Sequence, residues 1–109
     1  MTTTNTVETL RAADIDLVAK IHATCFYDAW APPMIRQVLN MPGTFALIVR
    51  RKNYSSIIGF ALARIVADEC ELLSLGVASE YRANGAGSLL LTATMGRAAL
   101  ENARWFFLE

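Results

Sequence analysis

The pattern of hydrophobic and polar positions along the chain predicts eight elements, in the order strand, helix, helix, strand, strand, strand, helix, strand. The predicted strands cover Val7–Arg11, Thr44–Arg51, Ser56–Val66, Cys70–Val77 and a segment that begins near Arg104. The predicted helices run from Asp14, which should cap the first of them, to about Phe26, from Pro32 to about Leu39, and from Ser88 to Asn102. Short links between the second, third and fourth strands favour antiparallel pairing. The last strand follows a helix and should lie parallel to the strand before it.

The segment between the fourth predicted strand and the third predicted helix has the composition of an anion-binding loop. It reads Arg82, Ala83, Asn84, Gly85, Ala86, Gly87 and Ser88. Its two glycines let the backbone approach a ligand closely. The N–H groups at the start of the helix favour a phosphate or pyrophosphate. A P-loop would need a lysine that is absent here, and a Rossmann loop would need a third glycine where Leu90 stands.

Composition and charge narrow the class of protein. The 109 residues suit one domain, and 54% of them are hydrophobic while 18% are charged. Ordinary globular domains have about 45–50% and about 25%, so part of the apolar surface is expected to meet a partner. A net charge of +0 and a pI near 6.6 argue against a nucleic-acid binder. The longest apolar runs are too short to span a bilayer.

The cysteines and the single histidine do not form a metal-ligand pattern. Cys25 and Cys70 are far apart and lack a CxxC spacing, so both are predicted to be reduced core residues of a cytoplasmic protein. The N-terminus has no pattern of a signal peptide. His22 lies one position from the apolar stripe of its helix, at Ile21, and is predicted to face solvent.

The order of elements and the motif Arg82-x-x-Gly85-x-Gly87 resemble the GNAT superfamily of N-acetyltransferases, whose acyl-CoA signature is Arg/Gln-x-x-Gly-x-Gly/Ala. Two flanking segments, Glu71-Leu72-Leu73 and Phe107-Leu108-Glu109, look like those of the RimI-type N-terminal acetyltransferases of ribosomal proteins. The resemblance implies an α/β fold with a mixed, mostly antiparallel sheet. It covers nearly the whole chain but about two-thirds of the family's domain. The rest of the fifth strand, the later strands and a tyrosine general acid would then be missing.

The resemblance also implies acetyl-CoA as cosubstrate, without a metal. Backbone N–H groups of Arg82–Ser88 would hold its pyrophosphate, and the Arg82 side chain would either help or order the loop. The pantetheine arm would pair with the backbone of Leu75, Gly76 and Val77. The N–H near Leu75 would polarise the acetyl carbonyl, and Gly76 would give room for the ligand. Alternatively, these segments are a plain capping turn and a plain core strand.

Carboxylates are the candidate catalytic side chains. By resemblance, Glu109 is the general base, acting through water; alternatively, it is a solvated terminal residue. Glu71 is a candidate second acidic group on the face of Leu73 and Leu75, or else an edge carboxylate. Tyr81 is predicted to pack on the loop.

The segment after the first helix is the candidate acceptor side. Trp30 and Tyr27 lie where acceptor peptides dock in the family, or else pack in the core.

These features favour an N-acetyltransferase that carries acetyl from acetyl-CoA to a primary amine, with a protein or peptide N-terminus as the expected acceptor. The amine would attack directly, because no cysteine lies in the motif to form an acyl-enzyme. One alternative is a truncated chain that binds CoA weakly and does not turn over. Another is a homodimer that pairs through the open edge of its sheet.

Overall fold

The computed structural model describes residues 5–51 and 56–108. Its sheet has the strand order β1-β2-β3-β4-β5. The strands are β1 (Asn5–Thr9), β2 (Thr44–Arg51), β3 (Ile57–Val66), β4 (Glu69–Val77) and β5 (Trp105–Leu108). The helices are α1 (Ile15–Cys25), α2 (Pro32–Leu39) and α3 (Ala86–Leu100), with short 3-10 turns at Ala12–Asp14 (η1) and Ser79–Tyr81 (η2). The predicted order is confirmed, and so is the pairing: β1 to β4 are antiparallel, and β5 is parallel to β4.

Two elements are shifted toward the N-terminus from their predicted bounds, for local reasons. The first strand spans Asn5–Thr9 instead of Val7–Arg11, because Ala12–Asp14 already turns toward α1. Helix α3 begins at Ala86 instead of Ser88, because Gly85 takes a left-handed conformation (φ 83°) and serves as its N-cap. Both motif glycines therefore lie at the helix start, the second of them inside the first turn.

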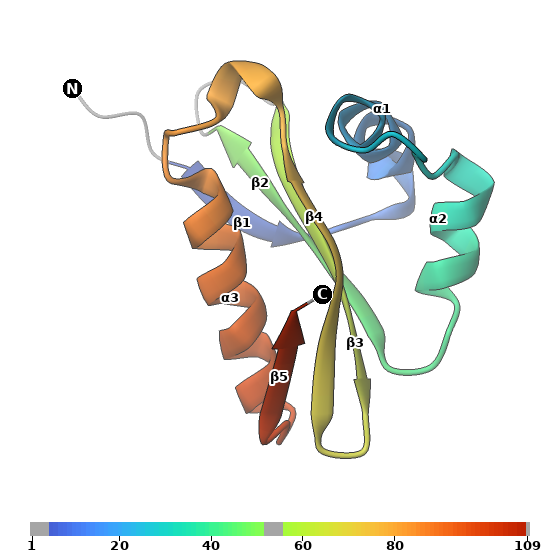
Figure 1. The fold of residues 1–109 in the computed structure, drawn as a ribbon, viewed down its shortest axis with the longest axis vertical. Helices are drawn as coiled ribbons and strands as arrows, with labels where there is room; N and C mark the ends of the chain where they lie inside the picture. Colours follow the sequence, from blue (N-terminus) through green and yellow to red (C-terminus); the bar gives the residue numbers. More distant parts are fainter. Residues whose placement is uncertain (1–4, 52–55, 109) are drawn as a thin grey trace.

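Helices cover both faces of the sheet (Figure 1). On one face, α1 and α2 pack against a core that includes Val18, Ile35 and Phe60. On the other face, α3 packs against a core that includes Ile58 and Leu90. The first seven residues of β3 are all buried, which explains why this strand is apolar without alternation.

A bulge in β4 changes which side chains share a face of the sheet. The register with β3 shifts between the pairs Leu62–Ser74 and Ala63–Leu72. Up to Leu72, the even-numbered residues of β4 face α3, whereas beyond the bulge Leu75 and Val77 do. Glu71 therefore shares a face with Leu73 but not with Leu75, which corrects the expectation that simple alternation gave.

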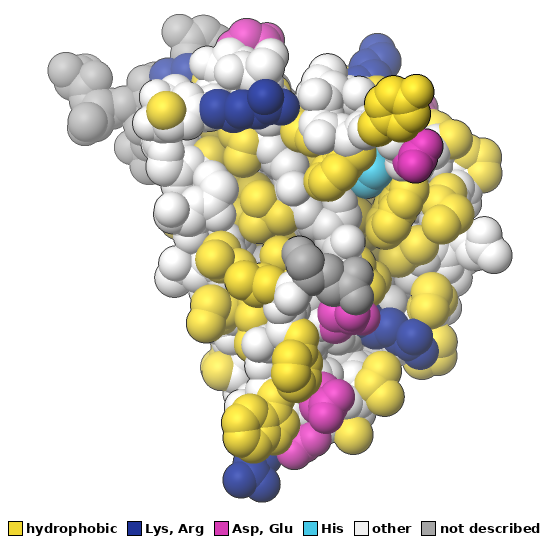
Figure 2. Space-filling model, in the orientation of Figure 1, with side chains coloured by type: hydrophobic (Ala, Val, Ile, Leu, Met, Phe, Trp, Pro, Cys, Tyr) yellow, Lys and Arg dark blue, Asp and Glu magenta, His cyan; other side chains and the backbone are white. Residues whose placement is uncertain are grey.

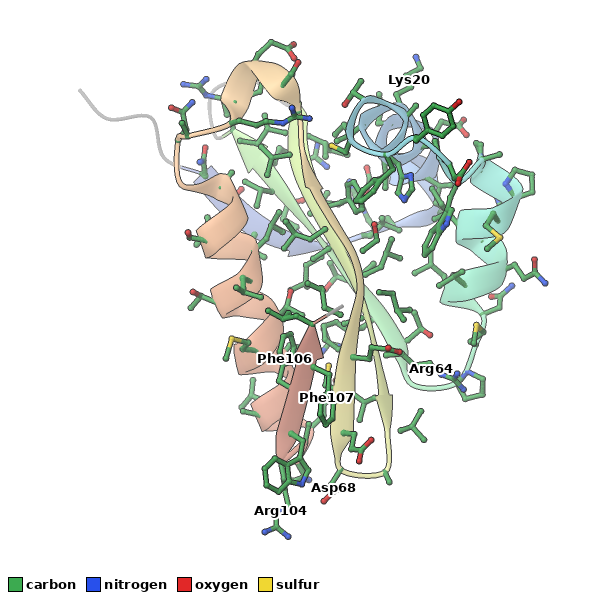
Figure 3. All side chains as sticks on the ribbon, in the orientation of Figure 1. Lys20, Arg64, Asp68, Arg104, Phe106 and Phe107 are labelled. Atoms are coloured by element: carbon green, nitrogen blue, oxygen red, sulfur yellow. The ribbon has the colours of Figure 1, made fainter. Side chains whose placement is uncertain are left out.

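The start of β5 is fixed by the turn between β3 and β4. Ala67 takes a left-handed conformation there (φ 55°). The backbone N–H groups of Arg104 and Trp105 both donate to the Asp68 carbonyl, at 2.6 and 3.1 Å. Asp68 and Arg104 accordingly lie together at one end of the molecule (Figure 3). In the described ranges, no helix is long and apolar enough to cross a membrane.

Asp14 fixes the start of α1, but in a different way from the predicted cap. Its carboxylate makes no hydrogen bond to the first turn of α1 and instead accepts the backbone N–H of Arg11, at 3.0 Å. It also pairs with Arg50 of β2, at 3.5 Å, and its side chain is only 7% exposed. The carboxylate thus ties the β1–α1 connection to the sheet.

Replacing Asp14→Ala should lower the free energy of unfolding by about 1–3 kcal/mol, because a buried acceptor of two partners is lost. Urea denaturation followed by circular dichroism measures this. The control is Asp16→Ala, which removes an exposed pair with Arg36 at 3.9 Å; it should change stability by less than about 1 kcal/mol. Equal losses in the two variants would contradict the role given to Asp14.

Candidate functional site

The C-terminal half of β4 presents backbone groups away from its neighbour β3. The Ala78 N–H donates to the Ile58 carbonyl at 2.8 Å, and the register of the adjoining pairs is unbroken from Gly59–Val77 to Leu62–Ser74. In an antiparallel pair, residues with inward and outward backbone groups alternate. The N–H and C=O groups of Leu75 and Val77 must therefore point to the side on which β5 runs. Among the described residues, the pairing between β4 and β5 runs from Glu69–Trp105 to Leu72–Leu108.

The loop that follows β4 leaves open space at the start of α3. Ala83 and Gly85 both have positive φ angles, of 70° and 83°. Leu89 makes an α-helical hydrogen bond to the Gly85 carbonyl, at 3.0 Å, so the N–H groups of residues 86–88 are the first three of the helix. A Cβ atom on Gly85 would meet nothing within 4 Å, and one on Gly87 would meet only Val77 Cγ2, at 3.8 Å. Such N–H groups beside open space suit an anion.

The Arg82 side chain folds back onto the end of β4. Its Nε donates to the Val77 carbonyl at 3.1 Å, and its Nη2 donates to Cys25 Sγ at 3.4 Å. The Cys25 thiol donates to the same carbonyl at 3.5 Å. Arg82 was expected either to help bind the ligand or to order the loop. These hydrogen bonds correspond to the second role, because they hold the loop against β4 and α1.

Gly76 leaves space that side chains of β3 and α1 fill. A Cβ atom at this position would lie 2.8 Å from Phe60 Cε1 and 2.9 Å from Cys25 Sγ. Gly76 is buried, and Phe60 is fully buried. Close packing of β3 and α1 against β4 is therefore a further reason for a glycine here, besides the expected room for a ligand.

His22 was predicted to face solvent, and this prediction is wrong. Its side chain is 2% exposed. The imidazole stacks on the rings of Trp30 and Phe60, at centroid distances of 5.0 and 5.6 Å, and Nδ1 accepts the Trp30 backbone N–H at 3.1 Å. Burial lowers the pKa of His22. The sequence spacing does predict burial, because His22 follows the buried Val18 by four residues and so lies on the same helix face.

The other predicted side chains fall in different surroundings. Trp30 is partly buried against the first core, whereas Tyr27 is fully exposed. Tyr81 packs against the core beneath α3, with the Arg51 guanidinium 5.0 Å from its ring centroid, which confirms the packing prediction. The structure therefore does not bring Trp30 and Tyr27 into one environment.

Glu71 lies on the α1–α2 face of the sheet, opposite Phe107 of β5 and Arg64 of β3. These three line a cavity of about 250 Å³ together with Val66 and Glu69. Arg64 and Phe107 can be followed in Figure 3. Glu109, the other predicted carboxylate, lies outside the described residues. The described residues contain no group of side chains that could hold a metal ion.

Comparison with known proteins identifies the family. Residues 15–109 match the model of the Acetyltransferase (GNAT) family. The chain belongs to this family. Over 110 residues it is 26% identical to a putative [ribosomal protein bS18]-alanine N-acetyltransferase of Bacillus subtilis, covering 100% of this chain and 72% of that protein.

Two solved structures agree with this GNAT chain in fold. The ribosomal-protein-S18-alanine N-acetyltransferase of Escherichia coli superposes with a TM-score of 0.85 at 18% identity, over 96% of this chain and 66% of that one. The structure of AAC(6')-Iy in complex with a bisubstrate analogue of CoA superposes with a TM-score of 0.79 at 13% identity, over 97% and 79%. The chain thus spans about two-thirds of the length of the E. coli enzyme.

Replacing Gly76→Ala should destabilise the fold by about 1–3 kcal/mol, because Phe60 and Cys25 would have to move away from the new methyl group. The measurement is chemical denaturation. Gly96→Ala in α3 is the control, since a Cβ there meets nothing within 4 Å; it should be neutral or stabilising by up to about 1 kcal/mol. A Gly76→Ala variant as stable as the parent chain would show that Phe60 can shift freely.

Proposed function

We propose that this GNAT chain binds acetyl-CoA between the end of β4 and the start of α3 and transfers its acetyl group to a primary amine. The observations that carry the proposal are the outward-facing backbone of Leu75 and Val77 and the open space beside Gly85 and Gly87. The strand edge suits the amides of a pantetheine arm, and the N–H groups at the helix start suit a diphosphate. When bound, the cosubstrate supplies an acetyl group activated as a thioester.

The chain's backbone groups have separate tasks in this proposal. The N–H groups of residues 86–88 hold the diphosphate by charge-assisted hydrogen bonds at the positive end of α3. The Leu75 N–H donates to the acyl oxygen and stabilises the negative charge that develops there as the amine attacks. Arg82 and Cys25 hold the Val77 carbonyl and so fix the end of the strand.

A carboxylate removes the proton from the acceptor amine. We propose Glu109 for this role, from its position in the RimI-type pattern, with Glu71 as the second candidate from its place on the α1–α2 face. An α-amino group has a pKa of about 7.7–8.0, so proton transfer to water and a carboxylate near neutral pH is undemanding.

The relative in B. subtilis supports the acceptor class, because it is named as a putative N-acetyltransferase for an alanine of ribosomal protein bS18. We therefore propose a peptide or protein N-terminus, with alanine as the first residue to test. A cytoplasmic location is proposed with it, because Cys25 and Cys70 are free thiols. Burial and the nearby Glu101 raise the pKa of the Cys70 thiol, which keeps it protonated and unreactive.

One observation favours a second candidate, a CoA-binding chain that associates with itself. The side chains of Trp105, Phe107 and Leu108 in β5 are 57%, 48% and 59% exposed. Figure 2 shows hydrophobic side chains exposed in this region. An apolar edge strand of this kind invites pairing with another copy. Analytical ultracentrifugation distinguishes the two candidate functions, because a monomer at micromolar concentration argues against the second one.

The first experiment is calorimetric titration with acetyl-CoA, with NAD as a control ligand. The chain should bind acetyl-CoA in a saturable way and ignore NAD. Gly87→Leu should weaken acetyl-CoA binding at least about tenfold, because its side chain would occupy the open space proposed for the diphosphate. Gly96→Leu lies farther along the same helix and should bind acetyl-CoA with an affinity within about twofold of that of the parent chain. Equal affinities of the two leucine variants would refute the proposed site.

The base is tested by isosteric amides. Glu109→Gln should lower kcat/KM for an alanine-initiated peptide by at least about 100-fold, and Glu71→Gln by less, because general base catalysis contributes about 10²–10⁴. The measurement is the initial rate of acetyl transfer near pH 8, with acetyl-CoA affinity as the control for folding. A larger loss in Glu71→Gln would exchange the two roles.

A further inference from the structure

His22, the single histidine of the chain, lies where α1, the segment 26–31 and β3 meet. Besides Trp30 and Phe60, it contacts Phe26, at a centroid distance of 4.5 Å. Four aromatic rings are thus stacked or tilted against one another beneath the α1–α2 connection. This connection follows the helix that packs on the face of β4 carrying Ser74 and Gly76.

The hydrogen bond to Trp30 requires the neutral imidazole. Nδ1 accepts the Trp30 N–H, so it carries no proton, and the ring proton must be on Nε2. In the imidazolium both nitrogens carry protons, and neither can accept a hydrogen bond. Protonation would therefore break this bond and place a positive charge among aromatic rings.

The same stack connects the segment 26–31 to β4, the strand that is proposed to bind the acyl group. Phe60, on which the imidazole lies, also occupies the space beside Gly76. Trp30, held by the imidazole, lines an open groove of about 580 Å³ together with residues of α1 and of the segment that precedes α2. His22 thus lies between Trp30, which lines this groove, and Phe60, which packs beside Gly76 of β4.

The charged and titratable groups on the surrounding elements do not compensate a charge on His22. They are Asp16, Lys20 and Cys25 on α1, Tyr27 and Asp28 in the connection, Arg36 on α2 and Arg64 on β3. Across residues 5–51 and 56–108, the imidazole forms no ion pair with any of them. Burial lowers the pKa of His22, in agreement with a site that favours the neutral ring.

We propose that His22 is a positioning residue for the acceptor: its neutral imidazole holds Trp30 and the segment 26–31 as a wall of the amine-binding side, and its protonation releases them. The inference rests on the proposed acyl transfer to an amine. It goes beyond that function by making acceptor affinity depend on a buried group that does not touch the reacting atoms. Acetyl-CoA affinity should be insensitive to the same proton.

The sign of the stability effect follows from linkage. Because the pKa of His22 is lowered in the folded chain, the unfolded chain takes up the proton first as the pH falls below about 6.5. The contribution of His22 to stability is therefore complete above that pH. It is lost progressively between the unfolded and the folded pKa as the solution becomes more acidic.

Two substitutions separate the hydrogen bond from the ring. His22→Asn places an amide oxygen near the position of Nδ1, so it can accept the Trp30 N–H without titrating. His22→Phe keeps a ring in the stack but cannot accept. The first measurement is hydrogen exchange at the Trp30 amide, followed by NMR together with the His22 ring signals from about pH 5 to 8.

Protection of the Trp30 amide should fall at least about fivefold in the parent chain as His22 takes up its proton, beyond the intrinsic pH dependence of exchange. It should be retained throughout by His22→Asn and weak at every pH in His22→Phe. A Trp30 amide that does not respond to the titration of His22 would overturn the proposal. If His22→Phe fails to fold, the comparison of the parent chain with His22→Asn still decides.

The second measurement is the KM for an alanine-initiated peptide, with the Kd of acetyl-CoA as its control. His22→Phe should raise this KM at least about fivefold and leave the Kd within about twofold. The acceptor amine titrates equally in all variants, so the ratio of parent chain to His22→Asn isolates the histidine. Identical pH profiles of KM in these two proteins would overturn the proposal. A chain that binds no acetyl-CoA would refute the proposed function, while the Trp30 amide would still report on His22.

Discussion

The contact between Phe60 and Gly76 is the constraint on which the arrangement of the site depends. The ring of Phe60 occupies the place where any other residue at position 76 would carry its Cβ. This lets β3 and β4 pair while α1 lies close above both, with Cys25 in the same space. Three features lie around this contact: the outward-facing backbone of Leu75 and Val77, the hydrogen bond from Arg82 to the end of β4, and the stacking of His22 on Phe60. A larger residue at position 76 would disturb each of them.

The proposed anion site would be built mainly from backbone, which is why glycines placed before a helix are enough to predict it. Gly85 suits the positive φ with which the chain turns there, and a side chain at Gly87 would project into the open space. Ala83 takes the left-handed conformation with a Cβ, which costs about 1–2 kcal/mol. Arg82 donates to the Val77 carbonyl and Tyr81 packs on the core beneath α3, and these contacts hold the neighbouring loop so that the strain can persist.

Strand order, helix placement and the parallel fifth strand could be predicted because they depend on periodicity and on the lengths of connections. The β4 bulge could not, because a single extra residue leaves the apolar pattern of Leu72, Leu73 and Leu75 intact while it changes their faces. His22 was missed for a different reason: its position beside Ile21 of the apolar stripe suggested solvent, but the spacing from Val18 gave the opposite orientation. The packing of Phe60 against Gly76 could not be predicted either, because no pattern along the chain shows which ring lies opposite.

The proposed cosubstrate and the proposed acceptor would be recognised by different kinds of group. A diphosphate and an amide arm are recognised by N–H and C=O groups whose directions follow from strand pairing and the start of a helix. In the proposed reaction, the acceptor amine would instead be placed by side chains on the α1–α2 face, where Trp30, Glu71 and Phe107 come from three separate elements. Their mutual position is set by the aromatic stack and by the β4 bulge. Acceptor choice in this chain should therefore respond to substitutions in those two features, whereas acetyl-CoA affinity should respond to the loop.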